Sequence, residues 1–193
     1  MDRLLRVFEH GAATLALFAG VAIAVLAVLI TIDIVGRDFF GASIQGTDEI
    51  GGYVLAFVGS LGMALTLLRR GHPRIELFFR FFPQAMRDGL HALAQLTMAG
   101  FALFMAWHAW GELQTTLRFG AITNTPLQTP LWVPQAVWLA GMVFFAVTAC
   151  LTSVHILTLL VTDRRSIERC YGPYTIEQEV RQYTGAEGDD ARD

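Results

Sequence analysis

Four long stretches without a charged side chain constrain the fold of this chain more than any other feature. The 193 residues include 31 Asp, Glu, Lys or Arg, but none of these falls within residues 11–32, 50–68, 89–111 or 119–162. A helix crosses the hydrocarbon core of a bilayer with about 20 apolar residues, and each stretch is long enough. The last one begins with a turn-rich segment, so its helix is expected to begin at Pro134, which suits a first helical turn.

The sequence therefore predicts an all-α integral membrane protein. Its four transmembrane helices are expected at about residues 11–35, 50–68, 89–111 and 134–161. Residues 1–162 would form one transmembrane domain, and residues 163–193 a polar tail whose end is disordered. The first stretch is too long for the apolar core of a signal peptide, so we expect it to remain as a helix.

The basic residues predict the orientation. All 14 of them are arginine, and 12 lie in the N-terminal tail, the loop between the second and third helices, or the C-terminal tail. Only Arg37 and Arg118 fall in the other two loops. The positive-inside rule then places both termini in the cytoplasm. This agrees with four spans, because an even number of spans puts the termini on the same side. The net charge of −3 argues against a nucleic-acid partner.

Aromatic residues suggest where the chain meets the membrane surface. Tryptophans end the predicted third helix and flank the start of the fourth, as expected for an aromatic belt on the outer side; they are Trp107, Trp110, Trp132 and Trp138. In the cytoplasmic loop, Ile75, Phe78, Phe79 and Phe82 follow a helical spacing, with Arg74, Glu76 and Arg80 turned elsewhere. This pattern predicts a short amphipathic helix at about 74–82 in the headgroup region; a turn of packed core is the alternative.

Small residues recur every four positions on the first two helices. The rows are Ala12, Ala16, Gly20 and Ala24 on the first, and Gly52, Ala56, Ser60 and Ala64 on the second. Such rows let helix backbones approach closely in lipid. They pack either within this chain or against another membrane subunit, and the composition does not separate the two.

Polar residues gather where the first helix is expected to end and the second to begin. Asp33 and Arg37 are spaced to pair on one helix face. Thr47 is expected to be the N-cap of the second helix, with Asp48 and Glu49 complementing its positive end. Capping and local pairing account for these residues, and contact with a partner is a second possibility.

No Asp, Glu, Lys or Arg lies in the middle of a predicted span. Transporters usually place such groups on the ion or substrate path, so this chain is not expected to move a solute by itself. A haem-binding anchor of an electron-transfer complex is the alternative, with His91 and His155 as axial ligands. Their depths differ by about 7 Å, which suits axial ligation poorly. Neither a catalytic motif nor a metal-binding spacing is found, so the sequence predicts no enzyme and no cofactor.

Three strings occur in order at the ends of the first, second and fourth predicted helices: IDIVGRDFFGASIQGTDEIGGY, LRRGHPRIEL and TPLWVPQ. Together they resemble the DctQ-like small membrane subunit of tripartite ATP-independent periplasmic (TRAP) transporters, over most of residues 1–162. The matching positions are Asp33, Gly36, Arg37, Phe40, Ser43, Gly46, Thr47, Glu49, Gly62, His72, Arg74, Pro130, Trp132, Pro134 and Gln135. Pro73 and Glu76 depart from the usual pattern.

The resemblance implies a set of partners. A large membrane subunit would hold the substrate and sodium sites, and a periplasmic binding protein would capture a carboxylate such as a dicarboxylate or another organic acid. The small subunit would be a non-catalytic scaffold among phospholipids of a bacterial inner membrane. The motif residues would then serve structure or subunit contact.

Overall fold

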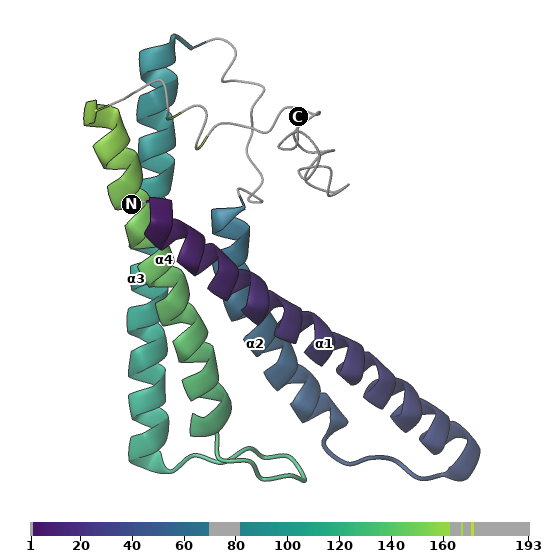
Figure 1. The fold of residues 1–193 in the computed structure, drawn as a ribbon. Coiled ribbons are helices and arrows are strands. Elements are labelled where there is room, and N and C mark those ends of the chain that lie inside the picture. The colour runs from purple at the N-terminus through teal and green to yellow at the C-terminus, as the bar shows by residue number, and fades with distance from the viewer. Residues whose placement is uncertain (1, 70–81, 163–166, 168–170, 172–193) are drawn as a thin grey trace, which may run out of the picture.

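The computed structural model describes residues 2–69 and 82–162 together with Ile167 and Tyr171. These residues form four helices, which are α1 (Asp2–Phe40), α2 (Thr47–Leu68), α3 (Gln84–Phe119) and α4 (Trp132–Thr162) (Figure 1). All four are long and apolar enough to cross a membrane, which confirms, for the described residues, an all-helical fold with four candidate spans. Within the described ranges, the only extended pairing is a single bridge between Ile122 and Pro130.

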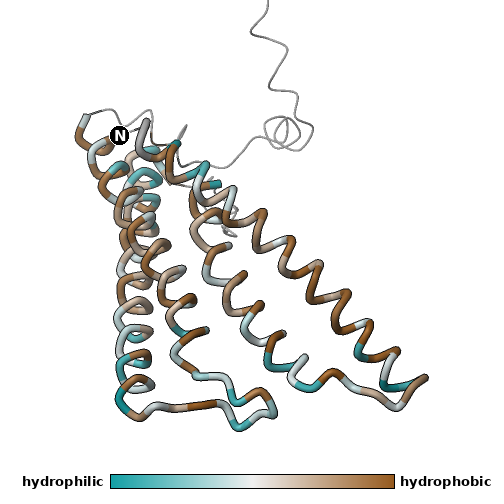
Figure 2. Tube along the Cα trace, turned by 60° about the horizontal axis from the view of Figure 1, so that its bottom comes forward, coloured by the Kyte–Doolittle hydropathy of each residue, from teal (hydrophilic) through white to brown (hydrophobic). Residues whose placement is uncertain are grey.

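Each helix contains one predicted span, and α1 and α3 continue well beyond theirs. The 36 residues of α3 correspond to about 54 Å, whereas the 22 residues of α2 correspond to about 33 Å. Charged residues mark the edge of an apolar stretch, but arginine and glutamate are good helix formers and do not end a helix. Figure 2 shows that α1 is hydrophobic over most of its length, with hydrophilic residues at its two ends.

The helices form two antiparallel hairpins, α1–α2 and α3–α4, which meet where α2 packs on α4. The hairpins diverge toward the end that carries the connections 41–46 and 120–131, here called the loop end (Figures 1 and 2). The opposite end, here called the terminal end, carries the start of α1 and the end of α4. On α1, buried residues recur every seven positions at Ala12, Ala19, Leu26 and Asp33, which makes its seam with α2 narrow.

Small residues form the junction between the hairpins. Ala64 and Leu67 of α2 pack with a cluster from the other hairpin that includes Ala99, Phe145 and Ala149. At Gly141 of α4, an added Cβ atom would lie 2.3 Å from Ser60 Oγ of α2. Alanine, glycine and serine thus allow the close helix approach that stabilises packing in lipid, where burial of apolar surface contributes little.

Candidate functional site

Asp33 fastens the connection between α1 and α2. Its side chain is buried, and its Oδ1 atom accepts hydrogen bonds from Ser43 Oγ at 3.0 Å and from the Ile44 backbone N–H at 2.5 Å. The Ala42 N–H donates to the Gly36 carbonyl at 3.2 Å, so the chain turns back onto the end of α1. The structure thus brings together Asp33 and Ser43, two residues that the sequence analysis singled out.

The predicted pairing of Asp33 with Arg37 is wrong. The Asp33 carboxylate faces the connection, and within the described residues its hydrogen bonds go to Ser43 and Ile44. Arg37 is exposed on the last turn of α1. A buried carboxylate needs hydrogen-bond donors, and the folded connection supplies them where the exposed arginine does not.

The prediction that Thr47 caps α2 is also wrong. The N-cap is Gly46, at a φ of +88°, and no side chain donates or accepts a capping hydrogen bond there. Thr47 is the first helical residue, is buried, and donates from Oγ1 to the Ile44 carbonyl at 2.9 Å. Gly46 also lies against Leu127, because an added Cβ would come within 2.3 Å of Leu127 Cδ1. Asp48 and Glu49 do occupy the first turn, as predicted.

Glu49 joins the two hairpins at the loop end. Its Oε1 atom accepts hydrogen bonds from Tyr53 on α2 and from Thr123 Oγ1, the latter at 2.9 Å, and its Oε2 atom accepts one from Thr125 Oγ1. The two threonine hydroxyls are 2.8 Å apart. We call Glu49, Tyr53, Thr123 and Thr125 the loop clamp. It ties the start of α2 to the 120–131 connection across the space between the hairpins (Figure 1).

The 120–131 connection is itself held in shape. The Thr123 N–H donates to the Thr129 carbonyl and the Leu131 N–H donates to the Ala121 carbonyl, each at 3.1 Å. These bonds place the threonine hydroxyls on one side of a narrow loop. Ionised carboxylates only accept hydrogen bonds, so three hydroxyl donors suit Glu49 well. The arrangement holds the first turn of α2 against the 120–131 connection.

Sequence reasoning identified Glu49 but missed its partners. Thr123 and Thr125 are 74 and 76 residues away along the chain. The only available signal was a pair of hydroxyl residues at i and i+2 in a turn-rich segment without charge. Gln135, a candidate motif residue in the sequence, lies in the first turn of α4. Its buried Oε1 atom has no hydrogen-bond partner within the described residues.

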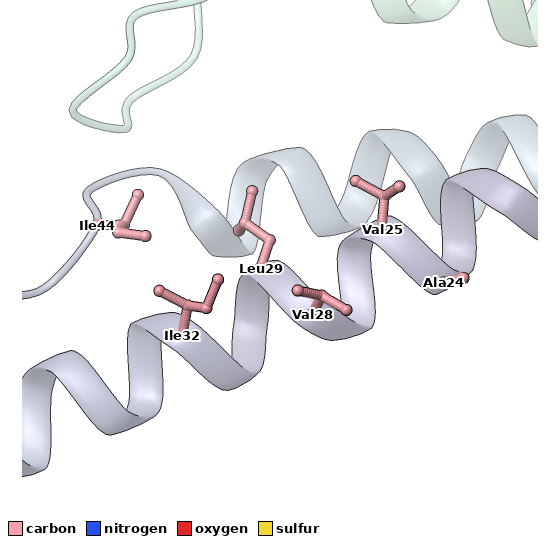
Figure 3. A pocket seen from close by; sticks show the side chains of 6 residues that line it. All are labelled: Ala24, Val25, Val28, Leu29, Ile32 and Ile44. Atoms are coloured by element: carbon pink, nitrogen blue, oxygen red, sulfur yellow. The ribbon is translucent and has the colours of Figure 1, made fainter.

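A broad face of α1 has no helix packed on it. Val21, Val25, Val28 and Ile32 are each more than half exposed. An open apolar groove of about 490 Å³ lies on this side. Its lining side chains, labelled in Figure 3, are Ala24, Val25, Val28, Leu29, Ile32 and Ile44. Ile44 lines the groove and belongs to the 41–46 connection, where its N–H donates to Asp33. The shape of the groove therefore depends on the connection that Asp33 holds in place.

A comparison with protein families matches residues 26–159 to the family described as tripartite ATP-independent periplasmic transporters, DctQ component. The chain belongs to this family. No curated protein matches the chain. The match covers the loop clamp, the Asp33 turn and most of α4, and it agrees with the resemblance drawn from the three sequence strings. With four helices that can cross a membrane, this DctQ component is a multi-pass membrane protein and a component of a TRAP transporter.

The two rows of small residues divide at mid-helix in this DctQ component. Ala12, Ser60 and Ala64, toward the terminal end, are buried inside the chain. Gly20 and Ala24 on α1 are exposed, and so are Gly52 and Ala56 on α2; Ala16 is intermediate. A four-residue spacing drifts around a helix relative to the narrow α1–α2 seam, so each row packs internally over part of its length only.

The remaining predicted residues are spread over α2, α3 and α4 or fall outside the described ranges. Trp107 and Trp110 do not end α3, which continues to Phe119; their indoles are exposed, as is that of Trp132. Trp138 packs in a cluster with Leu113 and Met142. Gly62 lies within α2 and Phe82 just precedes α3. Pro134 is in the first turn of α4, as expected.

The predicted interfacial helix at 74–82 falls almost entirely outside the described residues. So do the candidate residues His72, Arg74, Phe78, Phe79 and Arg80.

The haem alternative gains no support from the family match. His155 Nδ1 lies 2.8 Å from the Tyr171 hydroxyl, and His108 Nδ1 lies 3.0 Å from the Phe104 carbonyl oxygen. In the described part of the chain, no three His, Cys, Asp or Glu side chains gather in a geometry suited to a metal ion.

Proposed function

We propose that this chain is the non-catalytic scaffold subunit of a sodium-coupled importer that takes up organic acids with a periplasmic binding protein. The observation that carries the proposal is the match to the DctQ component over residues 26–159. The absence of Asp, Glu, Lys and Arg from the middle of the spans supports a scaffold role, because coupling ions need such groups or exposed backbone carbonyls. Sodium and substrate would bind to the large partner subunit.

In this proposal the loop end faces the periplasm and the terminal end faces the cytoplasm of a bacterial inner membrane. The division of arginines between the loops supports that orientation. Residues 74–82 would lie as an amphipathic helix among the cytoplasmic lipid headgroups. The loop clamp would then hold together the surface that a binding protein meets from outside.

The exposed face of α1 is the proposed contact with the large subunit. Gly20 has no atom near the position of an added Cβ, and Ala24 lines the apolar groove. Small exposed residues next to a groove let another helix approach closely. Lipid would cover the comparable exposed face of α3, which carries the bulkier Leu103 and Phe104.

Co-purification tests this contact. The chain is co-expressed with a tagged large subunit and the binding protein, and two matched double variants are compared. Gly20→Leu with Ala24→Leu fills the α1 face, whereas Gly100→Leu with Ala94→Leu makes the same changes at exposed positions of α3. We expect the α1 variant to lose recovery with the large subunit and the α3 variant to keep it. The reverse result would place the contact on α3.

Uptake tests the function itself. Proteoliposomes with all three components should accumulate an organic acid when a sodium gradient is imposed. Neither this chain alone nor the complex without it should do so. Uptake that survives removal of this chain would show that the scaffold is dispensable, and uptake by this chain alone would make it a transporter.

A further inference from the structure

The terminal end of the α3–α4 hairpin extends beyond the other two helices. Leu67, one residue before the end of α2, packs at the level of Ala99 on α3 and Ala149 on α4. From that level α3 extends 15 residues to Gln84, or about 22 Å, and α4 extends 13 residues to Thr162, or about 20 Å. Figure 1 shows the two helices rising past the ends of α1 and α2. Because α1 and α2 do not reach this part of the hairpin, its buried side chains must be covered by another segment.

Buried polar side chains join α3 and α4 in this extension. Gln95 Nε2 donates to Thr152 Oγ1, and Ser153 Oγ donates to the Gln95 carbonyl at 3.1 Å. Gln95, Thr152, Ser153 and His155 are all buried. Each of these groups must be shielded from lipid and water by something beyond the two helices, because two helices alone cover only one side of each other.

Two residues that follow α4 in sequence supply part of the shielding. Ile167 has no exposed surface and Tyr171 is 8% exposed. They pack in one cluster with Ala92 of α3 and Ile156 of α4, against which Leu159 and Leu160 also lie. The chain therefore returns to its own hairpin after α4 ends.

The Tyr171 hydroxyl contacts the buried polar residues between α3 and α4. It donates to the Thr152 carbonyl at 3.1 Å and lies 2.8 Å from His155 Nδ1. A tyrosine hydroxyl has one proton, and a carbonyl can only accept, so that proton goes to Thr152. His155 must then donate from Nδ1. The geometry assigns the Nδ1-protonated tautomer to neutral His155, with its ring tilted against that of Tyr171.

We propose that Ile167 and Tyr171 are a terminal latch, which fastens the start of the C-terminal tail to the α3–α4 hairpin where α1 and α2 do not reach. Tyr171 is the positioning residue, because its ring packs and its hydroxyl bridges His155 and Thr152. Beyond Tyr171 the sequence has six acidic residues and two arginines. The latch therefore fixes, at Tyr171, the point on the hairpin from which this acidic segment begins.

Limited trypsin digestion of the full chain in lipid nanodiscs tests the latch. The chain has no lysine, so trypsin cleaves only after arginine, and Arg169 lies between the two latch residues. Arg181, ten residues beyond Tyr171, is an internal reference. A protease needs an extended segment, so we expect cleavage after Arg169 to be much slower than after Arg181 in the wild type. Tyr171→Phe should accelerate cleavage after Arg169 by roughly tenfold and leave cleavage after Arg181 unchanged.

Two further measurements make the result decisive. Tyr183→Phe is the matched control and should change neither rate. Nitrogen NMR of labelled histidine at pH 8 should show an Nδ1-protonated His155 in the wild type, assigned with His155→Gln, and a changed signal in Tyr171→Phe. Equal wild-type cleavage after Arg169 and Arg181, no effect of Tyr171→Phe on cleavage after Arg169, or an Nε2-protonated His155 would each overturn the latch.

Discussion

Gly141 is the position at which the smallest change should separate the two hairpins. In Gly141→Ala, the new methyl group would lie 2.3 Å from Ser60 Oγ, 2.6 Å from Ser60 Cβ and 3.3 Å from the Ser60 carbonyl carbon. Carbon atoms prefer about 3.5–4.0 Å, so the Cβ pair must move apart by about 1 Å. Rotation of Ser60 moves its Oγ but leaves its Cβ in place. The helices themselves must therefore shift.

The expected loss of stability has two parts. Overpacking at a tight junction costs about 1–3 kcal/mol. Turning Ser60 away also breaks its hydrogen bond to the Phe57 carbonyl, 2.9 Å long, which contributes about 1 kcal/mol. The sum of about 2–4 kcal/mol corresponds to a fall in Tm of the order of 10 °C for a chain of this size.

Thermal unfolding in detergent micelles, followed by tryptophan fluorescence, measures the effect. Gly100→Ala is the matched control, because Gly100 is an exposed α3 residue whose added Cβ meets no atom within 4 Å. That control should be neutral or stabilising by up to about 1 kcal/mol, as expected for a helical glycine. Adding Ser60→Gly to Gly141→Ala removes the two shortest contacts and should restore most of the loss. Equal Tm values for Gly141→Ala and Gly100→Ala would refute the close junction.

The remaining predictions concern the loop end. Replacing Thr123 and Thr125 together by valine removes two donors to the loop clamp, so amide hydrogen exchange in the 120–131 connection should become several-fold faster; unchanged exchange would contradict the clamp. Gly46→Ala should lower the free energy of unfolding by at least about 1 kcal/mol, because φ is +88° and Leu127 must move, and a neutral effect on Tm would count against this turn. Asp33→Leu leaves the donors at that site unpaired and should cost about 1–3 kcal/mol, whereas Asp33→Asn keeps an accepting Oδ1 and should cost less; the opposite order in Tm would be inconsistent with the observed bonds.

These residues explain how a chain without Asp, Glu, Lys or Arg in the middle of its spans keeps its shape. The hairpins touch at Gly141 and Ser60, diverge from there, and are tied again at the loop end by Glu49 and the threonines of the 120–131 connection. A body fastened at two levels is stiffer than one joined at a single crossing, and the proposed scaffold role requires such stiffness.

The sequence by itself determined the number of spans and the family. Stretches such as 89–111 can only be buried in lipid or protein, because charge is costly in both and apolar surface is costly in water. Glycines, prolines and polar residues at helix ends, such as Gly46 and Pro134, preserve the turn chemistry by which the chain resembles its family. The apolar stretches and the residues at helix ends are both local features of the sequence, so they can be recognised without knowledge of the fold.

Tertiary structure alone decided which polar groups meet. Spacing along one helix favoured Arg37 as the partner of Asp33, and composition favoured Thr47 as a cap, but the folded connection offered Asp33 nearer donors and left the cap to Gly46. Glu49 and Thr123, or His155 and Tyr171, are joined only because hairpins and the returning tail bring distant segments together. The small-residue rows divide because a four-residue spacing drifts around the helix, so only part of each row lies on the face that packs within the chain.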